Sequence, residues 1–316
     1  MKFGAQVISF RTTWDDIRTS ITTLEAGRWN SLWFSDHFIP PRVQREEEYL
    51  TAFESLTLIA VAAGMTQKLR LGNLVLGNTF RNPALVAKMA ATLDQASKGR
   101  FTLGIGAAWF EREHEAYGWD FPSMRERSNR LQEACELIRK LFTADGPVDY
   151  DGRYYRLDEA RLSPGCYQQP HIPIMVGGTG EQRTLRTLAM HGDIMNVDGW
   201  PGGSGGMAFE LYQHKAGVLQ RHCEAVGRDP AEIKHTLTMP LHITDDKQSA
   251  EGFNEWLGPG AMAGPRDYII DRIGRFADAG VDEILLCPST PDGLAFPAGD
   301  VEALQRADEE IVAAFD

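Results

Sequence analysis

An acid and an imidazole, Asp36 and His37, follow an apolar run of the sequence. The run Ser-Leu-Trp-Phe-Ser at 31–35 has the composition of a buried strand, so both side chains would stand at its carboxyl end. Histidine titrates near neutral pH, which suits His37 to exchange a proton with a substrate or to hydrogen-bond one. Asp36 would orient the imidazole or contact a ligand. The alternative is a strand-end cap beside a histidine whose hydrogen bonds lie within the fold.

A second polar turn follows the apolar run at 69–76 and leads to Pro83, at the start of a helix. Gly72 and Gly77 permit a close approach to the backbone, as a planar ligand lying on the main chain requires. Arg81 could bind an anion or cap the end of the sheet. For these residues the structural and the functional interpretation both remain open.

The stretch 99–114 combines Gly-Ile-Gly at 104–106 with a tryptophan and a charged run. Two glycines at this spacing are half of a dinucleotide-binding fingerprint, but Ala108 and Trp109 stand where the third glycine and the helix should begin. We therefore exclude that motif, and we expect Trp109 to form a wall for an aromatic ligand. The alternative is a solvated charged loop. The groups that would titrate in the cavity are Glu111, Glu113 and His114.

A glycine-rich turn follows the apolar run at 173–176 and precedes a predicted helix. Its residues are Gly177, Gly178, Thr179 and Gly180. Free N–H groups and the positive end of the helix converge in such a turn, so an acidic protein could hold a phosphate there. Barrels often bind phosphate after their seventh and eighth strands, whereas this turn follows the fifth. The alternative is a plain strand-to-helix turn.

Short apolar runs alternate with stretches of helical spacing along the chain, which is typical of a parallel sheet with crossover helices. We expect eight strands, at 3–9, 31–35, 69–76, 101–105, 174–176, 193–197, 235–242 and 283–287. We expect helices at 14–26, 49–63, 84–96, 123–142, 182–190, 208–226, 267–279 and 301–315. Eight repeats close most economically into a TIM-type (β/α)8 barrel. The prediction is one α/β domain over residues 1–316, with insertions after several strands.

Active sites of such barrels lie on the loops that follow the strands, and several of these loops are long. The long loops are predicted at 36–48, 106–122, 198–206 and 244–266, and together they would enclose a large cavity. The segment 143–173, on the opposite side, is predicted to form a hairpin excursion.

Composition narrows the classes of function. The chain has 316 residues, with 32 Lys+Arg against 44 Asp+Glu for a net charge of −12, and this balance argues against binding to nucleic acid. Its four cysteines are scattered and no apolar run reaches about 18 residues, so we expect a cytoplasmic protein that neither spans nor binds a membrane. A metal-dependent barrel hydrolase would need clustered ligands on an early strand, and residues 3–9 include no His, Asp or Glu. No metal site is therefore expected.

Taken together, the four stretches resemble the luciferase-like monooxygenase superfamily, and within it the oxidoreductases that use the deazaflavin coenzyme F-420. The shared patterns are S-D-H-F, L-G-x-x-V-x-x-x-x-x-R-x-P, G-R-F-x-L-G-I-G-A-x-W-x-x-x-E and P-I-M-V-G-G-T-G. They occur in the family's order, and the resemblance spans residues 2–287.

The resemblance implies a cofactor at the mouth of the barrel, with its ring backed by a bulged third strand. A non-proline cis peptide would lie at 73–74 or 74–75. Asp36 would meet the polar edge of the ring, the turn at 177–180 its phosphate, and His37 its reacting face. The implied cofactor contacts are Asp36, Asn73, Leu74, Val75, Gly106, Gly177, Gly178, Thr179 and Gly180.

The implied activity is hydride transfer between coenzyme F-420 and a small organic substrate, either an alcohol/carbonyl pair or an activated double bond. His37 would handle the coupled proton, with Glu113 as a second catalytic candidate. Sugar-phosphate dehydrogenases of this branch carry a catalytic glutamate just after the fourth-strand glycines. This chain has Trp109 there, which argues against that substrate class.

Two alternatives keep the fold. One is a monooxygenase that uses reduced flavin mononucleotide (FMN) and oxygen, and the other is a flavin-binding barrel without catalysis. The superfamily commonly forms dimers, so a homodimer is expected.

Overall fold

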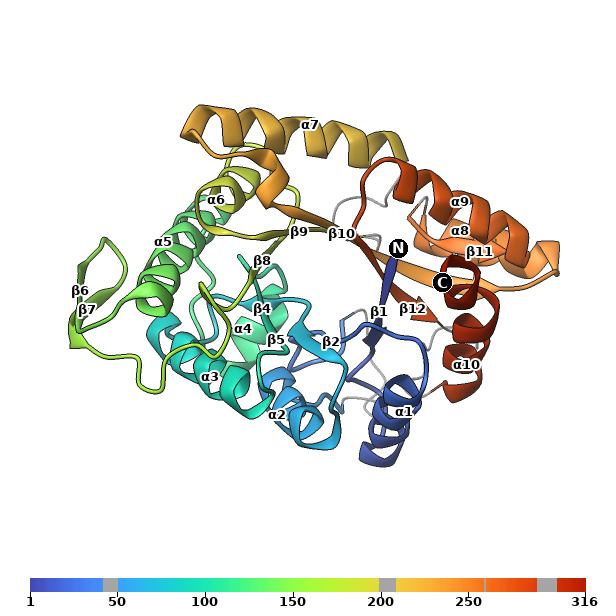
Figure 1. The fold of residues 1–316 in the computed structure, drawn as a ribbon, viewed down its shortest axis with the longest axis horizontal. Helices are drawn as coiled ribbons and strands as arrows, with labels where there is room; N and C mark the ends of the chain where they lie inside the picture. The colour runs from blue at the N-terminus through green and yellow to red at the C-terminus, as the bar shows by residue number, and fades with distance from the viewer. Residues whose placement is uncertain (42–50, 199–208, 259, 289–299) are drawn as a thin grey trace.

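Eight parallel strands close into a barrel, because β1 pairs with β2 on one side and with β12 on the other (Figure 1). Around the barrel the order is β1, β2, β3, β5, β8, β9, β10 and β12, and the β9–β10 pairing completes the ring. The computed structural model describes residues 1–41, 51–198, 209–258, 260–288 and 300–316. The predicted TIM-type barrel is confirmed.

The strands of the barrel are short and buried, as expected for a parallel sheet covered by helices. Their bounds are β1 Lys2–Val7, β2 Ser31–Phe34, β3 Arg70–Asn73, β5 Phe101–Gly106, β8 Ile174–Gly177, β9 Ile194–Asp198, β10 Lys234–Ile243 and β12 Glu283–Pro288. The described residues also form β4 Leu76–Gly77, which pairs with β5, and β11 Met262–Gly264, which pairs with β10. An antiparallel hairpin consists of β6 Val148–Asp151 and β7 Arg156–Ala160.

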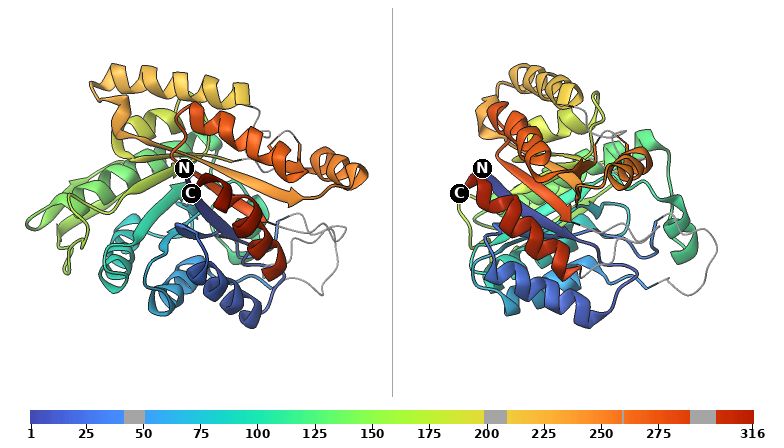
Figure 2. Two further views of the ribbon diagram at one scale, coloured as in Figure 1. Left: turned by 45° about the vertical axis from the view of Figure 1, so that its right-hand side comes forward. Right: turned by 90° about the vertical axis from the view of Figure 1, so that its right-hand side faces the viewer.

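Helices surround the barrel, and most of them bury apolar side chains against it. Their bounds are α1 Trp14–Ala26, α2 Ser55–Met65, α3 Pro83–Ala96, α4 Glu111–Tyr117, α5 Met124–Thr143, α6 Thr184–His191, α7 Phe209–Val226, α8 Lys247–Leu257, α9 Arg266–Asp278 and α10 Val301–Glu310. Among the described residues, 3₁₀ turns lie at Pro230–Glu232 and Val312–Phe315. In the right-hand view of Figure 2 both termini lie at the same end of the barrel.

Several predicted boundaries are wrong, for local reasons. The strand expected at 69–76 is interrupted, and a cis peptide joins Leu74 to Val75 between β3 and β4, at one of the two predicted bonds. The expected loop 106–122 includes α4, and 244–266 includes α8 and β11. The hairpin expected within 143–173 is confirmed. The helix expected at 49–63 begins at Ser55. Some of the expected residues lie outside the described part of the chain. They are the first residues of the helices expected at 49–63 and 208–226, and parts of the loops expected at 36–48, 198–206 and 244–266.

The interruption of the third strand is packed into space left by glycines on the two following strands. A Cβ atom at Gly104 would overlap the backbone carbonyl oxygen of Asn73. Cβ atoms at Gly106 and Gly177 would lie 2.9 Å and 2.6 Å from the side chain of Val75. The three glycines therefore make room for the backbone and side chain of one bulge.

We predict that Gly104→Ala destabilises the fold by about 3 kcal/mol, because the added methyl group meets a backbone atom that cannot move aside cheaply. The matched control is Gly64→Ala on α2, where an added Cβ atom would meet nothing within 4 Å. That change should stabilise the helix by about 0.5–1 kcal/mol. Urea unfolding of both variants measures the difference, and equal midpoints would contradict the steric argument.

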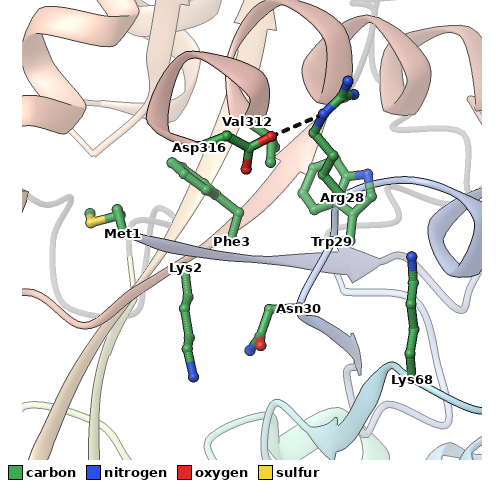
Figure 3. Close-up of a pocket in the computed structure, with 9 residues that line it drawn as sticks. All are labelled: Met1, Lys2, Phe3, Arg28, Trp29, Asn30, Lys68, Val312 and Asp316. Atoms are coloured by element: carbon green, nitrogen blue, oxygen red, sulfur yellow. Dashed lines mark ion pairs between the residues drawn. The ribbon is translucent and has the colours of Figure 1, made fainter.

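A cavity of about 330 Å³ lies at the amino-terminal end of the barrel, where β1, β2 and β3 begin. Figure 3 shows its lining, in which Arg28 and Asp316 form an ion pair with 3.1 Å between Nε and Oδ2. Asp36 and His37 lie at the opposite end of the barrel, where the strands finish.

Within the described residues, no helix is both long and apolar enough to cross a membrane.

Candidate active site

Asp36 stands two residues after the end of β2 and is buried, with 5% of its surface exposed. Both of its carboxylate oxygens accept hydrogen bonds from the guanidinium group of Arg81, each at 2.8 Å. Its Oδ2 also accepts the amide hydrogen of Gly77 at 3.0 Å. Two oxygens offer about four acceptor positions, so one on Oδ1 remains for a ligand.

Arg81 has a second acidic partner, Glu54, which accepts from it at 2.6 Å and also caps the start of α2. Burial acts to raise the pKa of Glu54, but its hydrogen bonds to Thr57 and Leu56 and the charge of Arg81 bring it below the ordinary value. Burial acts to lower the pKa of Arg81, but its hydrogen bonds and ion pairs with Asp36 and Glu54 outweigh burial, so the pKa lies above the ordinary value. Arg81 therefore holds two carboxylates at the end of the barrel.

His37 pairs with Glu113, whose side chain is 1% exposed. The Nδ1 atom of His37 lies 3.2 Å from each carboxylate oxygen of Glu113. Glu113 Oε1 also accepts from the backbone amides of Phe38, at 2.6 Å, and Ile39, at 3.1 Å. Because a carboxylate only accepts, Nδ1 carries the hydrogen, and Nε2 of the neutral ring is left with a lone pair for a substrate proton.

Glu113 and His114 are held in place by α4, which buries both side chains instead of leaving them in a charged loop. The Nδ1 atom of His114 lies 2.9 Å from the carbonyl oxygen of Phe110, so it must be the donor. Its Nε2, 2.7 Å from Thr79 Oγ1, then accepts the hydroxyl hydrogen of that residue when the ring is neutral. His114 thus anchors α4 to the turn after β4.

Aromatic rings surround the imidazole of His37. Phe10, Trp109 and Phe110 approach it edge-on, with centroid distances of 6.2, 5.7 and 6.2 Å. Trp109 stacks on Phe110 at 5.2 Å and yet remains 55% exposed. The predicted aromatic wall is therefore adjacent to the predicted proton-transfer group.

The interrupted third strand brings Leu74 and Val75 to the same end of the barrel, where both are only partly buried. Asn73 points away from them, because its side chain donates to Ser55 Oγ at 2.6 Å. Its Oδ1 has no partner among the described residues. Of the three strand residues expected to contact a cofactor, Leu74 and Val75 therefore present apolar surface, and the side chain of Asn73 faces α2.

The turn after β8 leads into α6, as the sequence predicts. Gly178 has φ = +106°, a backbone conformation that favours glycine. Within the described part of the chain, no acceptor binds the amide hydrogens of Gly178, Thr179 and Gly180. Lys215 and His214 pair with the next residue, Glu181, and lower its pKa, so its charge is balanced beside the free amides.

A planar heterocycle with an anionic tail fits these features. The half-buried surface of Leu74 and Val75 would support the ring, and the amides at 178–180 would hold the anion. Gly106 and Gly177 serve a different purpose in this structure, because the space beside them is taken by Val75. Among the described residues, no three His, Cys, Asp or Glu side chains gather in a way that could hold a metal ion.

The sequence predicts Asp36, His37 and Glu113 as site residues and leaves open whether Arg81 binds an anion or caps the end of the sheet. In the structure Arg81 binds the carboxylates of Asp36 and Glu54. Glu54 is a site residue that the sequence analysis does not predict, although an acid just before an apolar helix is the signal of an N-terminal cap.

The fold and the site together define an α/β-barrel enzyme whose polar groups gather at the carboxyl ends of the strands. The chain belongs to the luciferase-like monooxygenase family, whose family model matches residues 1–253. The family predicted from the four motifs is confirmed.

Curated relatives with related sequences carry the name F420-dependent glucose-6-phosphate dehydrogenase. The protein from Nocardia farcinica (strain IFM 10152) is 37% identical over 297 residues, covering 81% of this chain and 82% of that protein. The one from Kineococcus radiotolerans (strain ATCC BAA-149 / DSM 14245 / SRS30216) is 32% identical over 254 residues, covering 79% and 71%.

Solved structures share the fold at lower identity. An F420-dependent secondary alcohol dehydrogenase in complex with an F420-acetone adduct is 21% identical, with a TM-score of 0.82 over 100% of this chain and 99% of that one. The coenzyme F420 dependent tetrahydromethanopterin reductase from Methanopyrus kandleri is 19% identical, with a TM-score of 0.78 over 100% and 99%. These likenesses confirm the barrel.

Proposed function

We propose that the chain is an oxidoreductase that transfers a hydride between coenzyme F-420 and a small organic substrate, either an alcohol/carbonyl pair or an activated carbon–carbon double bond. The observation that carries the proposal is the His37–Glu113 pair, which stands at the same end of the barrel as the half-buried Leu74 and Val75. The family and the names of the curated relatives support coenzyme F-420 as the cofactor.

When bound, a deazaflavin supplies a carrier for two electrons and a proton in the form of hydride. We propose that Leu74 and Val75 support its ring and that the amides at 178–180 hold its phosphate. The remaining acceptor position on Asp36 Oδ1 would meet the polar edge of the ring. Asn73, Gly106 and Gly177 would contribute through the backbone, since their side-chain positions are engaged or absent.

The protein's own contribution to the reaction is the handling of one proton. In alcohol oxidation, Nε2 of His37 takes the hydroxyl proton as the substrate carbon loses hydride, and in reduction the same atom returns it. Glu113 accepts the hydrogen on Nδ1 and thereby keeps the lone pair of Nε2 directed toward the substrate. Trp109 and Phe110 exclude water from one side of the imidazole.

Titration of the purified protein with coenzyme F-420 and with FMN, side by side, tests the proposal. We expect coenzyme F-420 to bind at least about tenfold more tightly, a difference of about 1.4 kcal/mol. Tighter binding of FMN, together with oxygen-dependent turnover of the reduced flavin, would favour the monooxygenase instead. Failure of both to bind would overturn the whole assignment.

Glu113→Gln should lower kcat by about 10- to 100-fold, because the amide preserves the shape but removes the charge that stabilises protonated His37. The amide NH₂ would also donate to Nδ1 and move the ring hydrogen to Nε2. Steady-state kinetics measure kcat, and urea unfolding of the same variant shows whether the fold is intact. A kcat within about threefold of the parent value in a stable variant would refute a catalytic role for Glu113.

We also propose that the chain is a single domain, acts in the cytoplasm and forms a homodimer. Size-exclusion chromatography with light scattering tests the last point directly. A monomer at the concentrations used for assay would refute the dimer.

A further inference from the structure

Trp109 is exposed, and it directly follows a residue with a left-handed backbone conformation. The preceding residue, Ala108, has φ = +60°, a left-handed conformation that L-residues other than glycine rarely adopt. Such strain persists where the surrounding structure requires it, and it concentrates at functional sites. Here the left-handed residue precedes Trp109, a residue that is 55% exposed and whose ring centroid lies 5.7 Å from that of His37.

The neighbours of Trp109 form an apolar surface. Its ring stacks on Phe110 with an interplanar angle of 26°, and Phe10 completes the aromatic edge around His37. An exposed tryptophan has a large apolar face, which gains most when another apolar or aromatic group covers it. A substrate bound at Nε2 of His37 lies within reach of this face.

The described charges near His37 do not favour an anionic substrate. Arg81 is bound by two carboxylates, and Arg11 donates to the carbonyl oxygen of Pro41 at 3.3 Å. The helix α4 carries three glutamates and one arginine.

We infer that the substrate presents an uncharged aromatic or apolar group, attached to the reacting carbon, that packs on the indole of Trp109. Trp109 is therefore a specificity-determining residue, and a phosphorylated sugar is excluded as the preferred substrate. The inference rests on the proposed function, since it assumes that His37 faces the reacting group. It separates this chain from its curated relatives, whose names specify glucose 6-phosphate.

The test measures binding to the protein loaded with oxidised coenzyme F-420, by isothermal titration calorimetry with acetophenone and with glucose 6-phosphate as probes. We expect acetophenone to bind at least about tenfold more tightly. Trp109→Ala should weaken acetophenone binding by about tenfold, and Trp109→Phe should stay within about threefold of the parent, because it retains an aromatic face. The control is Tyr167→Ala, an equally exposed aromatic at 53% on the segment that precedes β8, which should change nothing.

Tighter binding of glucose 6-phosphate, or an unchanged acetophenone affinity in Trp109→Ala, would overturn the inference. The affinity for coenzyme F-420, measured first in every variant, separates the two proposals. If the cofactor binds but the probes behave contrary to expectation, only the substrate class is wrong. If the cofactor fails to bind to the parent protein, the proposed function itself is wrong.

Discussion

Replacement of His37 by alanine is expected to lower kcat by about 10³-fold while leaving the affinity for coenzyme F-420 nearly unchanged. The reason is that Nε2 is the free nitrogen of a ring whose Nδ1 is committed to Glu113, at 3.2 Å from both of its oxygens. No other described histidine combines a buried acidic partner with a position after a barrel strand. Steady-state kinetics and a fluorescence titration of the cofactor provide the two measurements.

His37→Asn separates proton transfer from positioning. The asparagine amide can still donate to Glu113, but it has no titratable nitrogen to exchange a proton with substrate. We expect it to be as inactive as the alanine variant. Activity close to that of the parent would refute general acid–base catalysis by His37, and redox activity unchanged in both variants would favour a barrel that binds the cofactor without using this residue.

Replacement of Arg81 by methionine is expected to destabilise the fold by about 3–5 kcal/mol, because it leaves two carboxylates without their cation. Asp36 is 5% exposed and accepts two hydrogen bonds from the guanidinium, so water cannot readily take the place of the arginine. Methionine preserves much of the packing length of the side chain, which limits any additional cavity effect. The free energy of unfolding in urea measures the loss.

Arg156→Met is the matched control, because Arg156 also forms a 2.7 Å ion pair with an aspartate, but its side chain and that of Asp151 are 80% and 78% exposed. Such a surface pair contributes about 0–1 kcal/mol. If the two variants were equally stable, burial would not be what makes the Arg81 pair strong, and the account of the site around Asp36 would be wrong.

The barrel could be predicted because its strands and helices are each recognisable from a short stretch of sequence. Each strand is a short apolar run and each following helix repeats its small and apolar residues at helical spacing, so eight repeats could be recognised without knowing which strands pair. Asp36 and His37 could be located for the same reason, since they end one such run. The turn at 177–180 was recognisable from its glycines between a strand and a helix.

The partners of these residues depend on contacts that are distant in the sequence. Glu113 lies 76 residues from His37, and α4 is a seven-residue helix rich in charge, without the apolar repeat that would have revealed it. The pairing of Arg81 with both Asp36 and Glu54 depends on how β2, α2 and the turn after β4 meet at one end of the barrel. Sequence spacing identifies candidates for such a cluster but not their pairing.

The glycines around Val75 also carry an evolutionary consequence. Gly104, Gly106 and Gly177 come from two different strands, yet each lacks a side chain because of the same neighbouring bulge. In a related protein whose third strand lacked this bulge, the steric requirement for glycine would disappear at all three positions. A methyl group at Gly104 would require the backbone at Asn73 to move, whereas one at Gly106 or Gly177 would require only a smaller side chain at position 75. Gly104 should therefore change in evolution only together with the bulge, and the other two glycines together with Val75.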